Sequence, residues 1–234
     1  MMKIIVLLLA AASCAETPIQ KNTYHNETFN QYVVSSAKDD PIYRSIVLLK
    51  NPKHHSLATG VVFKNINNNS YILSAKHFCK RRGIKVDVLS VQDSKNQREE
   101  FYAKVVYVDK KFDVCILRAY DTAKLFLPAK LAKKPPKIGD RVMTIGAPGG
   151  IFPTKTEGYV VGYNLLGDLD EEGSEANALV TSIPVSSGNS GGAIYNEKYE
   201  LVGILKAVST EYHHSSIGVH LDTVKRAIKR YFKK

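Results

Sequence analysis

Short apolar runs rich in β-branched residues follow one another along most of the chain, separated by turn signals. Such runs are typical of strands, and their close spacing favours an all-β barrel or sandwich. The predicted strands are Ser45–Lys50, Ala58–Lys64, Tyr71–Ser74, Lys85–Val91, Phe101–Asp109, Val114–Arg118, Arg141–Gly146, Thr156–Tyr163, Ala178–Ile183, Ala193–Tyr195, Leu201–Val208 and Ile217–His220. Asn65–Ser70 contains several residues that tolerate positive φ, which predicts a hairpin turn.

Two segments depart from this pattern. Ala129–Lys137 contains two prolines and four lysines, which predicts an exposed linker between two lobes. Leu221–Lys234 places apolar residues along one helical face and Lys or Arg around the rest, which predicts an amphipathic helix capped by Asp222 or Thr223. That helix either docks on the barrel with a solvated basic face or is attracted to an anionic membrane or nucleic acid. Its apolar face is Val224, Ala227, Ile228, Tyr231 and Phe232.

The first residues resemble a secretory signal. Ile4–Ala12 is an unbroken apolar run after Met1-Met2-Lys3, and it is shorter than the roughly 20 residues that span a bilayer. We expect residues 1–15 to be removed on export. Two processing routes are possible. Cleavage after Ala15 would release the protein. If residues 11–14 instead act as a lipobox, Cys14 would be lipidated and would tether the protein to a membrane. Residues 16–40 are polar and predict a surface arm.

Composition adds limits to this picture. The chain has 234 residues, of which 44% are hydrophobic and 24% charged, as in ordinary globular proteins. Its three cysteines are too few for a disulfide-rich mini-protein. The net charge of +11 is compatible with an anionic partner but carries no information about the fold.

The most specific chemical signal is the string Gly188-Asn189-Ser190-Gly191-Gly192. Small residues around a serine let the chain turn sharply, expose the hydroxyl and aim the N–H groups of Gly188 and Ser190 at one point. Two convergent donors of this kind form an oxyanion hole. A glycine-rich hairpin turn is the alternative explanation.

A nucleophilic serine needs a base, and the base needs an orienting acid. His77 follows the apolar run Tyr71–Ser74, and Asp113 opens another apolar run. A carboxylate at the start of a buried strand is costly without a partner, and a histidine N–H would supply one.

With these residues in place the chain resembles the trypsin-like serine proteases. SAKHF around His77, FDVCILRA from Phe112, and GNSGGAI followed by ELVGI are similar to that family's motifs for its His, Asp and Ser, in the same order. ATGVVF, the stretch KIGDRVMTIGAPGG and IGVHLDTVKRAI are closer to the HtrA/DegP type of bacterial protease. The resemblance covers roughly residues 42–232.

The resemblance implies an all-β fold of two six-stranded antiparallel barrels (a chymotrypsin-like double barrel) with a C-terminal helix. The protease domain would span residues 41–234, with barrels at about 41–128 and 138–221, a linker at 129–137 and a helix at 222–234. It also implies an exported serine endopeptidase in which Ser190 is the nucleophile, His77 the general base and Asp113 its orienting acid. Gly188 and Ser190, with Asn189 between them, would form the oxyanion hole.

The substrate pocket follows from the same comparison. Its floor would lie near Pro184 and Val185, where no acidic residue could bind a basic side chain, and Lys206, Ala207 and Val208 would form one wall. This predicts a preference for small or medium aliphatic residues before the scissile bond. A glutamyl-specific endopeptidase is the alternative within the enzyme class, because Lys206 could attract an acidic side chain.

Several features depart from the family. Lys206 stands where Ser or Thr is usual, and its side chain would either pair with Asp113 or point away. Cys79 and Cys115 each lie two residues after a triad member, so the triad would bring them close, either as a disulfide or as two buried thiols. We expect no C-terminal PDZ domain after the terminal helix, so the peptide sensing of full HtrA proteins is not carried over.

The expected partners are protein or peptide substrates in an extracytoplasmic compartment, with a membrane tether through Cys14 or the basic helix left open. We expect no cofactor, no metal and no specific nucleic acid. The alternatives from other classes are a catalytically silent relative that binds a protein or anionic surface, and a basic surface-binding module. Retention of His77, Asp113, Ser190 and Gly188 favours the enzyme.

Overall fold

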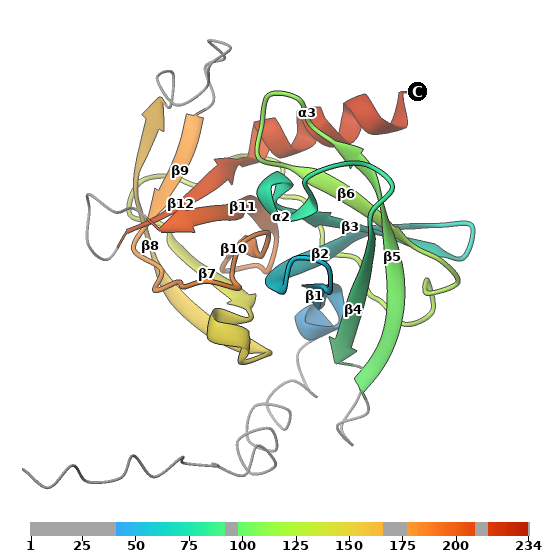
Figure 1. Cartoon of the computed structure of the whole chain (residues 1–234). Helices are drawn as coiled ribbons and strands as arrows, with labels where there is room; N and C mark the ends of the chain where they lie inside the picture. Colours follow the sequence, from blue (N-terminus) through green and yellow to red (C-terminus); the bar gives the residue numbers. More distant parts are fainter. Residues whose placement is uncertain (1–40, 92–97, 166–176, 209–214, 234) are drawn as a thin grey trace, which may run out of the picture.

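The chain forms two barrels and a terminal helix in a computed structural model, which describes residues 41–91, 98–165, 177–208 and 215–233. In this part, twelve strands form two closed antiparallel barrels, which lie side by side in Figure 1. The strand order is β1-β2-β3-β6-β5-β4 in the first barrel and β10-β11-β12-β9-β8-β7 in the second. The predicted double-barrel class is therefore confirmed.

Each predicted strand corresponds to an observed one, with ends that differ by up to three residues. The turn between β2 and β3 forms where expected, because Asn67 and Asn68 both adopt positive φ. The strands are β1 (Ile46–Asn51), β2 (Ser56–Ile66), β3 (Asn69–Ser74), β4 (Lys85–Val91), β5 (Arg98–Val108), β6 (Cys115–Ala119), β7 (Arg141–Gly146), β8 (Thr154–Leu165), β9 (Asn177–Thr181), β10 (Ala193–Asn196), β11 (Leu201–Val208) and β12 (Ser216–His220).

The continuous apolar runs reflect burial on both faces of a strand. In β1, Val47 and Leu49 belong to a core cluster of the first barrel, whereas Ile46 and Leu48 belong to a second cluster that continues into the other barrel. Successive strand residues point to opposite faces, so both faces must be apolar here. The first barrel is thus filled inside and also packed outside against its neighbour.

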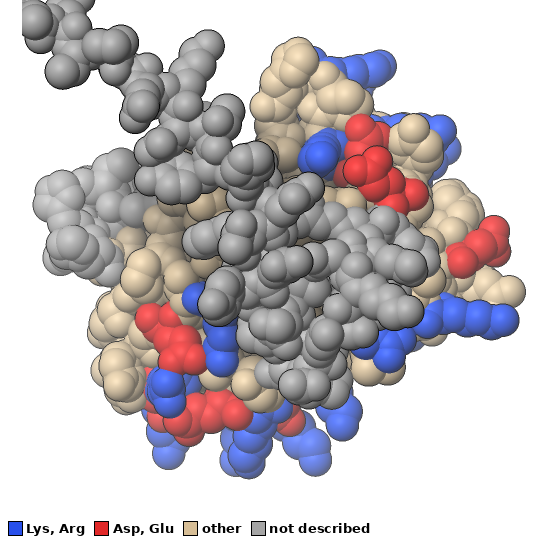
Figure 2. All heavy atoms as spheres, turned by 90° about the horizontal axis from the view of Figure 1, so that it is seen from below, with Lys and Arg blue, Asp and Glu red and all other residues tan. Residues whose placement is uncertain are grey.

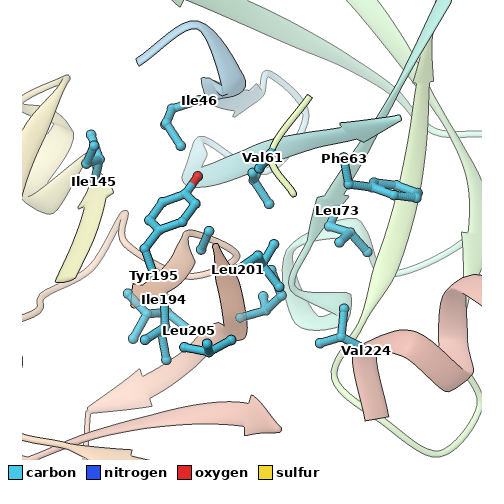
Figure 3. Packing of buried hydrophobic residues seen from close by; sticks show 14 of the residues in the cluster. Ile46, Val61, Phe63, Leu73, Ile145, Ile194, Tyr195, Leu201, Leu205 and Val224 are labelled. Carbon is cyan, nitrogen blue, oxygen red and sulfur yellow. The ribbon is translucent and has the colours of Figure 1, made fainter. Parts of the chain in front are cut away.

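Tyr195 of β10 lies at the centre of the contact between the barrels. Figure 3 shows its ring among Ile46, Ile145 and Ile194, with the hydroxyl directed toward the first barrel. That hydroxyl lies 3.2 Å from the Ser45 hydroxyl, within hydrogen-bond distance. A buried polar atom is therefore satisfied across the interface, which fixes how the two barrels meet.

The C-terminal helix α3 (Leu221–Phe232) lies across the first barrel as well as its own. It buries Leu221, Thr223, Val224 and Ala227. The predicted cap at Asp222 or Thr223 is wrong, because His220 is the N-cap and its Nδ1 accepts a hydrogen bond from the Asp222 N–H. A neutral imidazole nitrogen replaces the oxygen that usually does this.

The segment that joins the barrels is not fully exposed. Ala129 and Ala132 are buried, and their N–H groups donate to the carbonyl oxygens of Val62 and Leu201. Among the described residues, no helix has the length and apolar character needed to span a membrane. The predicted signal at 1–15, Cys14 and the arm at 16–40 lie outside the described residues.

Candidate active site

His77 and Asp113 form a hydrogen-bonded pair in the first barrel. His77 lies in the short helix α2 (Lys76–Cys79), directly after β3, and Asp113 lies in the loop before β6. The His77 ring Nδ1 is 2.8 Å from Asp113 Oδ2, and the His77 backbone N–H donates to Oδ1 at 2.9 Å. Two contacts from one carboxylate fix both the position and the tautomer of the imidazole.

The electrostatics of this pair suit a general base. The hydrogen bond to Asp113 raises the pKa of His77 above 6.5, against partial burial and the positive charge of Lys206. Burial alone would raise the pKa of Asp113, but the hydrogen bonds and charge of His77 lower it below its ordinary value. The side chain of Asp113 is 11% exposed and that of His77 is 51% exposed, so the acid is buried and the base remains accessible.

Ser190 comes from the second barrel, in the turn before β10. Its carbonyl oxygen accepts the N–H of Thr59 in β2 at 2.9 Å, which brings the serine to the barrel junction. Its hydroxyl donates to the carbonyl oxygen of Lys206 at 3.3 Å. Within the described residues no hydrogen bond joins this hydroxyl to His77, a contact that often tightens only when substrate is bound.

The loop around Gly188 has a backbone conformation that only glycine adopts easily. Gly188 has φ of 100°, and a Cβ there would lie 2.0 Å from the carbonyl oxygen of Ala147. The N–H groups of Gly188 and Ser190 donate to no other described residue. They are therefore available to a ligand. Asn189 differs, because its N–H donates to Ser186 and its side chain is buried beside Gly146.

Thr59 links this loop to the first barrel, a role that the sequence did not reveal. Its hydroxyl donates to the Gly188 carbonyl oxygen at 2.7 Å and accepts the Ala147 N–H at 3.1 Å. Its own carbonyl oxygen accepts the Ser74 hydroxyl at 2.8 Å. Thr59 precedes the glycine of the ATGVVF motif, which is the signal that could have identified it.

A pocket of about 230 Å³ opens beside Ser190. Val185 and Lys206 line it, whereas Pro184 is exposed and its carbonyl oxygen accepts the Thr156 hydroxyl at 3.0 Å. The side chains of Ala207 and Val208 lie outside the described part. The described lining residues are Val185, Ser186, Ser187, Asn189, Ser190, Leu205 and Lys206.

Lys206 is the charged residue among those lining residues. Its positive charge lowers the pKa of both His77 and Asp113, so the ammonium group acts on the His77–Asp113 pair. In the part of the chain that the structure describes, it forms no ion pair within 4.0 Å with Asp113. Lys206 therefore lowers the pKa values of His77 and Asp113 through its charge, without an ion pair to Asp113.

Cys79 and Cys115 form a disulfide, which decides between the two alternatives left open by the sequence. The bridge joins α2, which carries His77, to the first residue of β6, which follows Asp113. Both elements of the His–Asp pair are therefore covalently linked. No cluster of three or more His, Cys, Asp or Glu side chains that could hold a metal occurs in the described ranges.

Comparison with protein families identifies the domain type. Residues 58–204 match the family model described as a trypsin-like peptidase domain. This match contains His77, Asp113 and Ser190, and it extends over both barrels.

Curated relatives are bacterial proteases with longer chains. A probable periplasmic serine endoprotease DegP-like of Buchnera aphidicola subsp. Baizongia pistaciae is 32% identical over 163 residues, which is 70% of this chain and 33% of the relative. The periplasmic pH-dependent serine endoprotease DegQ of Escherichia coli is 31% identical over 152 residues, or 65% of this chain and 31% of DegQ. The chain thus spans about a third of the length of these relatives.

Solved structures agree with the fold. The serine endoprotease of Yersinia pestis has a TM-score of 0.67 at 21% identity and covers 88% of this chain and 67% of its own. The inactive form of Rv3671c from M. tuberculosis has a TM-score of 0.68 at 20% identity, covering 86% and 91%. At this identity the likeness supports the arrangement of the barrels.

Proposed function

Since the chain belongs to the family of trypsin-like peptidase domains, we propose that it is a serine endopeptidase that cleaves peptide bonds through an acyl-enzyme. Ser190 is the nucleophile, His77 the general base and Asp113 the orienting acid. The single observation that carries the proposal is the double contact of Asp113 with His77, through the ring at 2.8 Å and the backbone N–H at 2.9 Å.

The reaction uses these groups in sequence. His77 takes the proton of the Ser190 hydroxyl as its oxygen attacks the peptide carbonyl carbon, and then gives that proton to the leaving amine. Asp113 stabilises the imidazolium that forms between the two transfers. The N–H groups of Gly188 and Ser190 bind the oxyanion of the tetrahedral intermediate. Water then hydrolyses the ester in the same way.

A fluorophosphonate probe, which phosphonylates only activated serines with loss of fluoride, tests this proposal. The wild-type chain should react at Ser190, whereas Ser190→Ala should not react. His77→Ala and Asp113→Asn should lower peptide turnover by about four orders of magnitude. A wild-type protein that is folded by circular dichroism yet unreactive would contradict the proposal and favour a silent relative.

The pocket supports a small or medium aliphatic side chain before the scissile bond. Val185 and Leu205 supply apolar surface, and no acidic side chain occurs among the described lining residues. A side chain of that size fits about 230 Å³, and the buried apolar area is worth about 25 cal/mol per Å². A peptide library should show cleavage after residues such as Val or Leu. Cleavage mainly after Arg or Lys would refute this specificity, and cleavage after Glu would make Lys206 a binding group.

We place the enzyme outside the cytoplasm, acting on protein or peptide substrates. The apolar run Ile4–Ala12 and the periplasmic relatives support this location, and a disulfide is stable in an oxidising compartment. Attachment to a membrane through Cys14 is tested by metabolic labelling with a radioactive fatty acid, with Cys14→Ser as the control.

The basic residues do not require an anionic partner. Figure 2 shows Lys and Arg at the upper, right and lower rims of the visible face, with acidic side chains among them. On α3, Arg226 lies over the Phe112 ring at 5.2 Å, and Lys225 donates to the Lys133 carbonyl oxygen at 3.0 Å. These side chains are engaged within the molecule, which supports docking of the helix rather than membrane or nucleic-acid attraction.

A further inference from the structure

The helix α3 reaches from the second barrel to the loop of the first barrel that carries Asp113. Its residue Arg230 lies within 3.3 Å of Asp109 Oδ2 and 3.4 Å of Oδ1, measured from Nη1. Asp109 and Arg230 are 121 positions apart in the chain. This contact is separate from the reacting groups and is not used in the mechanism above.

Asp109 organises the loop between β5 and β6. Its Oδ1 accepts the N–H groups of Lys111 at 2.9 Å and Phe112 at 3.2 Å. Its backbone N–H donates to the carbonyl oxygen of Val114 at 3.0 Å, which closes the loop around Asp113. The geometry of the Asp109 carboxylate therefore determines where the loop places Asp113.

This carboxylate is fully buried, with a side-chain exposure of 0%. Burial would raise the pKa of Asp109, but the hydrogen bonds from Tyr107, Lys111 and Phe112, together with the charge of Arg230, lower it below its ordinary value. A buried charge without a partner is strongly destabilising. Arg230 is the positive side chain that meets it, because the ion pair joins these two residues directly.

Side chains of α3 also pack against the loop 109–114. Arg226 and Arg230 lie over the Phe112 ring at 5.2 and 5.7 Å, and Phe112 directly precedes Asp113. Tyr231 packs against Tyr107 with ring centroids 5.9 Å apart, and the Tyr107 hydroxyl donates to Asp109 Oδ2 at 2.6 Å. The helix α3 thus contacts the loop 109–114 and the adjoining end of β5 through an ion pair, cation–π contacts and ring packing.

We infer that Arg230 is a positioning residue for catalysis, acting through Asp109 and the loop 109–114 to hold Asp113 against His77. The inference rests on the proposed function. Loss of the Arg230 charge leaves Asp109 buried without its cation, so the loop shifts and the Asp113–His77 contacts lengthen. A displacement of this kind far from the chemistry lowers turnover because the reacting geometry is less often reached.

The test uses the full chain with Arg230→Gln, compared with Arg230→Lys and with Lys229→Gln. Lys229 is the neighbouring exposed cation on α3, and its side chain makes no hydrogen bond or ion pair with other described residues. We expect Arg230→Gln to lower kcat about tenfold with little change in KM. Arg230→Lys should recover most of that loss, and Lys229→Gln should match the wild type.

The pH profile separates positioning from a purely structural role. Asp113 raises the pKa of His77, so weakening that contact should move the acidic limb of kcat/KM to lower pH in Arg230→Gln. A folded Arg230→Gln protein with wild-type kcat and an unmoved limb would overturn the inference. If that variant does not fold, Tyr107→Phe, which removes one donor to Asp109, decides by the same two measurements. An unreactive wild-type protein would instead overturn the proposed function.

Discussion

The Thr59 hydroxyl of the first barrel donates a hydrogen bond to the carbonyl oxygen of Gly188 in the second, at 2.7 Å. Both residues are buried, and the same hydroxyl accepts the Ala147 N–H. One side chain therefore satisfies two backbone groups, one of them in the loop that carries the proposed oxyanion-hole donors.

Thr59→Val should lower both stability and turnover. The substitution keeps the shape but leaves the Gly188 carbonyl and the Ala147 N–H buried without partners, which costs about 1–3 kcal/mol each. We expect a lower free energy of unfolding in urea and a reduced kcat, because the loop is no longer held. Thr59→Ser keeps the hydroxyl and should therefore retain most of the free energy of unfolding and most of kcat. Equal losses in the two variants would contradict this assignment, because Thr59→Ser retains the hydroxyl.

Gly188→Ala should abolish most activity while the barrels still form. A Cβ at Gly188 would lie 2.0 Å from the backbone oxygen of Ala147, so the loop must move. The N–H groups of Gly188 and Ser190 would then no longer point at the same position. Loss of an oxyanion-hole donor costs about 10²–10³ in kcat. Gly83→Ala is the matched control, since Gly83 has φ of 87° but nothing within 4 Å of an added Cβ. Gly83→Ala should lower the free energy of unfolding by about 1–2 kcal/mol and leave kcat unchanged. A similar loss of kcat in Gly83→Ala and Gly188→Ala would contradict this prediction.

Lys206→Met should shift the pH dependence of catalysis. The positive charge of Lys206 lowers the pKa of His77, so its removal should raise that pKa. Because the base must be neutral to accept the proton, the acidic limb of kcat/KM should move to higher pH. The hydrogen bond from Ser190 goes to the backbone oxygen of residue 206 and should persist. Lys206→Arg should leave the limb in place, and a shift to lower pH in Lys206→Met would refute this account.

Opening the disulfide should weaken both the fold and the catalytic pair. The Cys79–Cys115 bridge closes a loop of 36 residues, for which loop closure predicts about 2–5 kcal/mol of stability. We expect a reductant to lower the urea midpoint and kcat of the wild type. The double variant Cys79→Ala, Cys115→Ala should begin at these lower values and be insensitive to reductant. Continued sensitivity in the double variant would assign the effect to another group.

The strands were predictable from the sequence because their burial is simple. Ile46 to Leu49 are apolar on both faces, since one face fills the first barrel and the other packs on the second. The same holds for the turn at Asn67 and Asn68, whose residue type tolerates the observed φ. Local sequence therefore determines these elements almost completely.

The parts that were missed depend on the tertiary arrangement. His220 caps α3 although histidine is not among the preferred capping residues, because β12 places its Nδ1 beside the Asp222 N–H. Thr59 and Gly188 are 129 positions apart, and nothing local to either indicates their contact. Lys206 likewise lies at an irregularity in the pairing of β11 with β12, between Leu205 and Ala207, which the alternation of residues along the chain does not indicate.

The contact between Asp109 and Arg230 also bears on the order of folding. The first barrel precedes α3 in the chain, so any early form of it contains Asp109 without the cation that arrives 121 positions later. Contacts of such long sequence separation form late and slow the search for the native state. A first barrel that closes alone is penalised by its own buried carboxylate. We therefore expect the two barrels to unfold in one cooperative transition, because the first barrel is fully stabilised only when α3, which follows the second barrel in the chain, has docked on it.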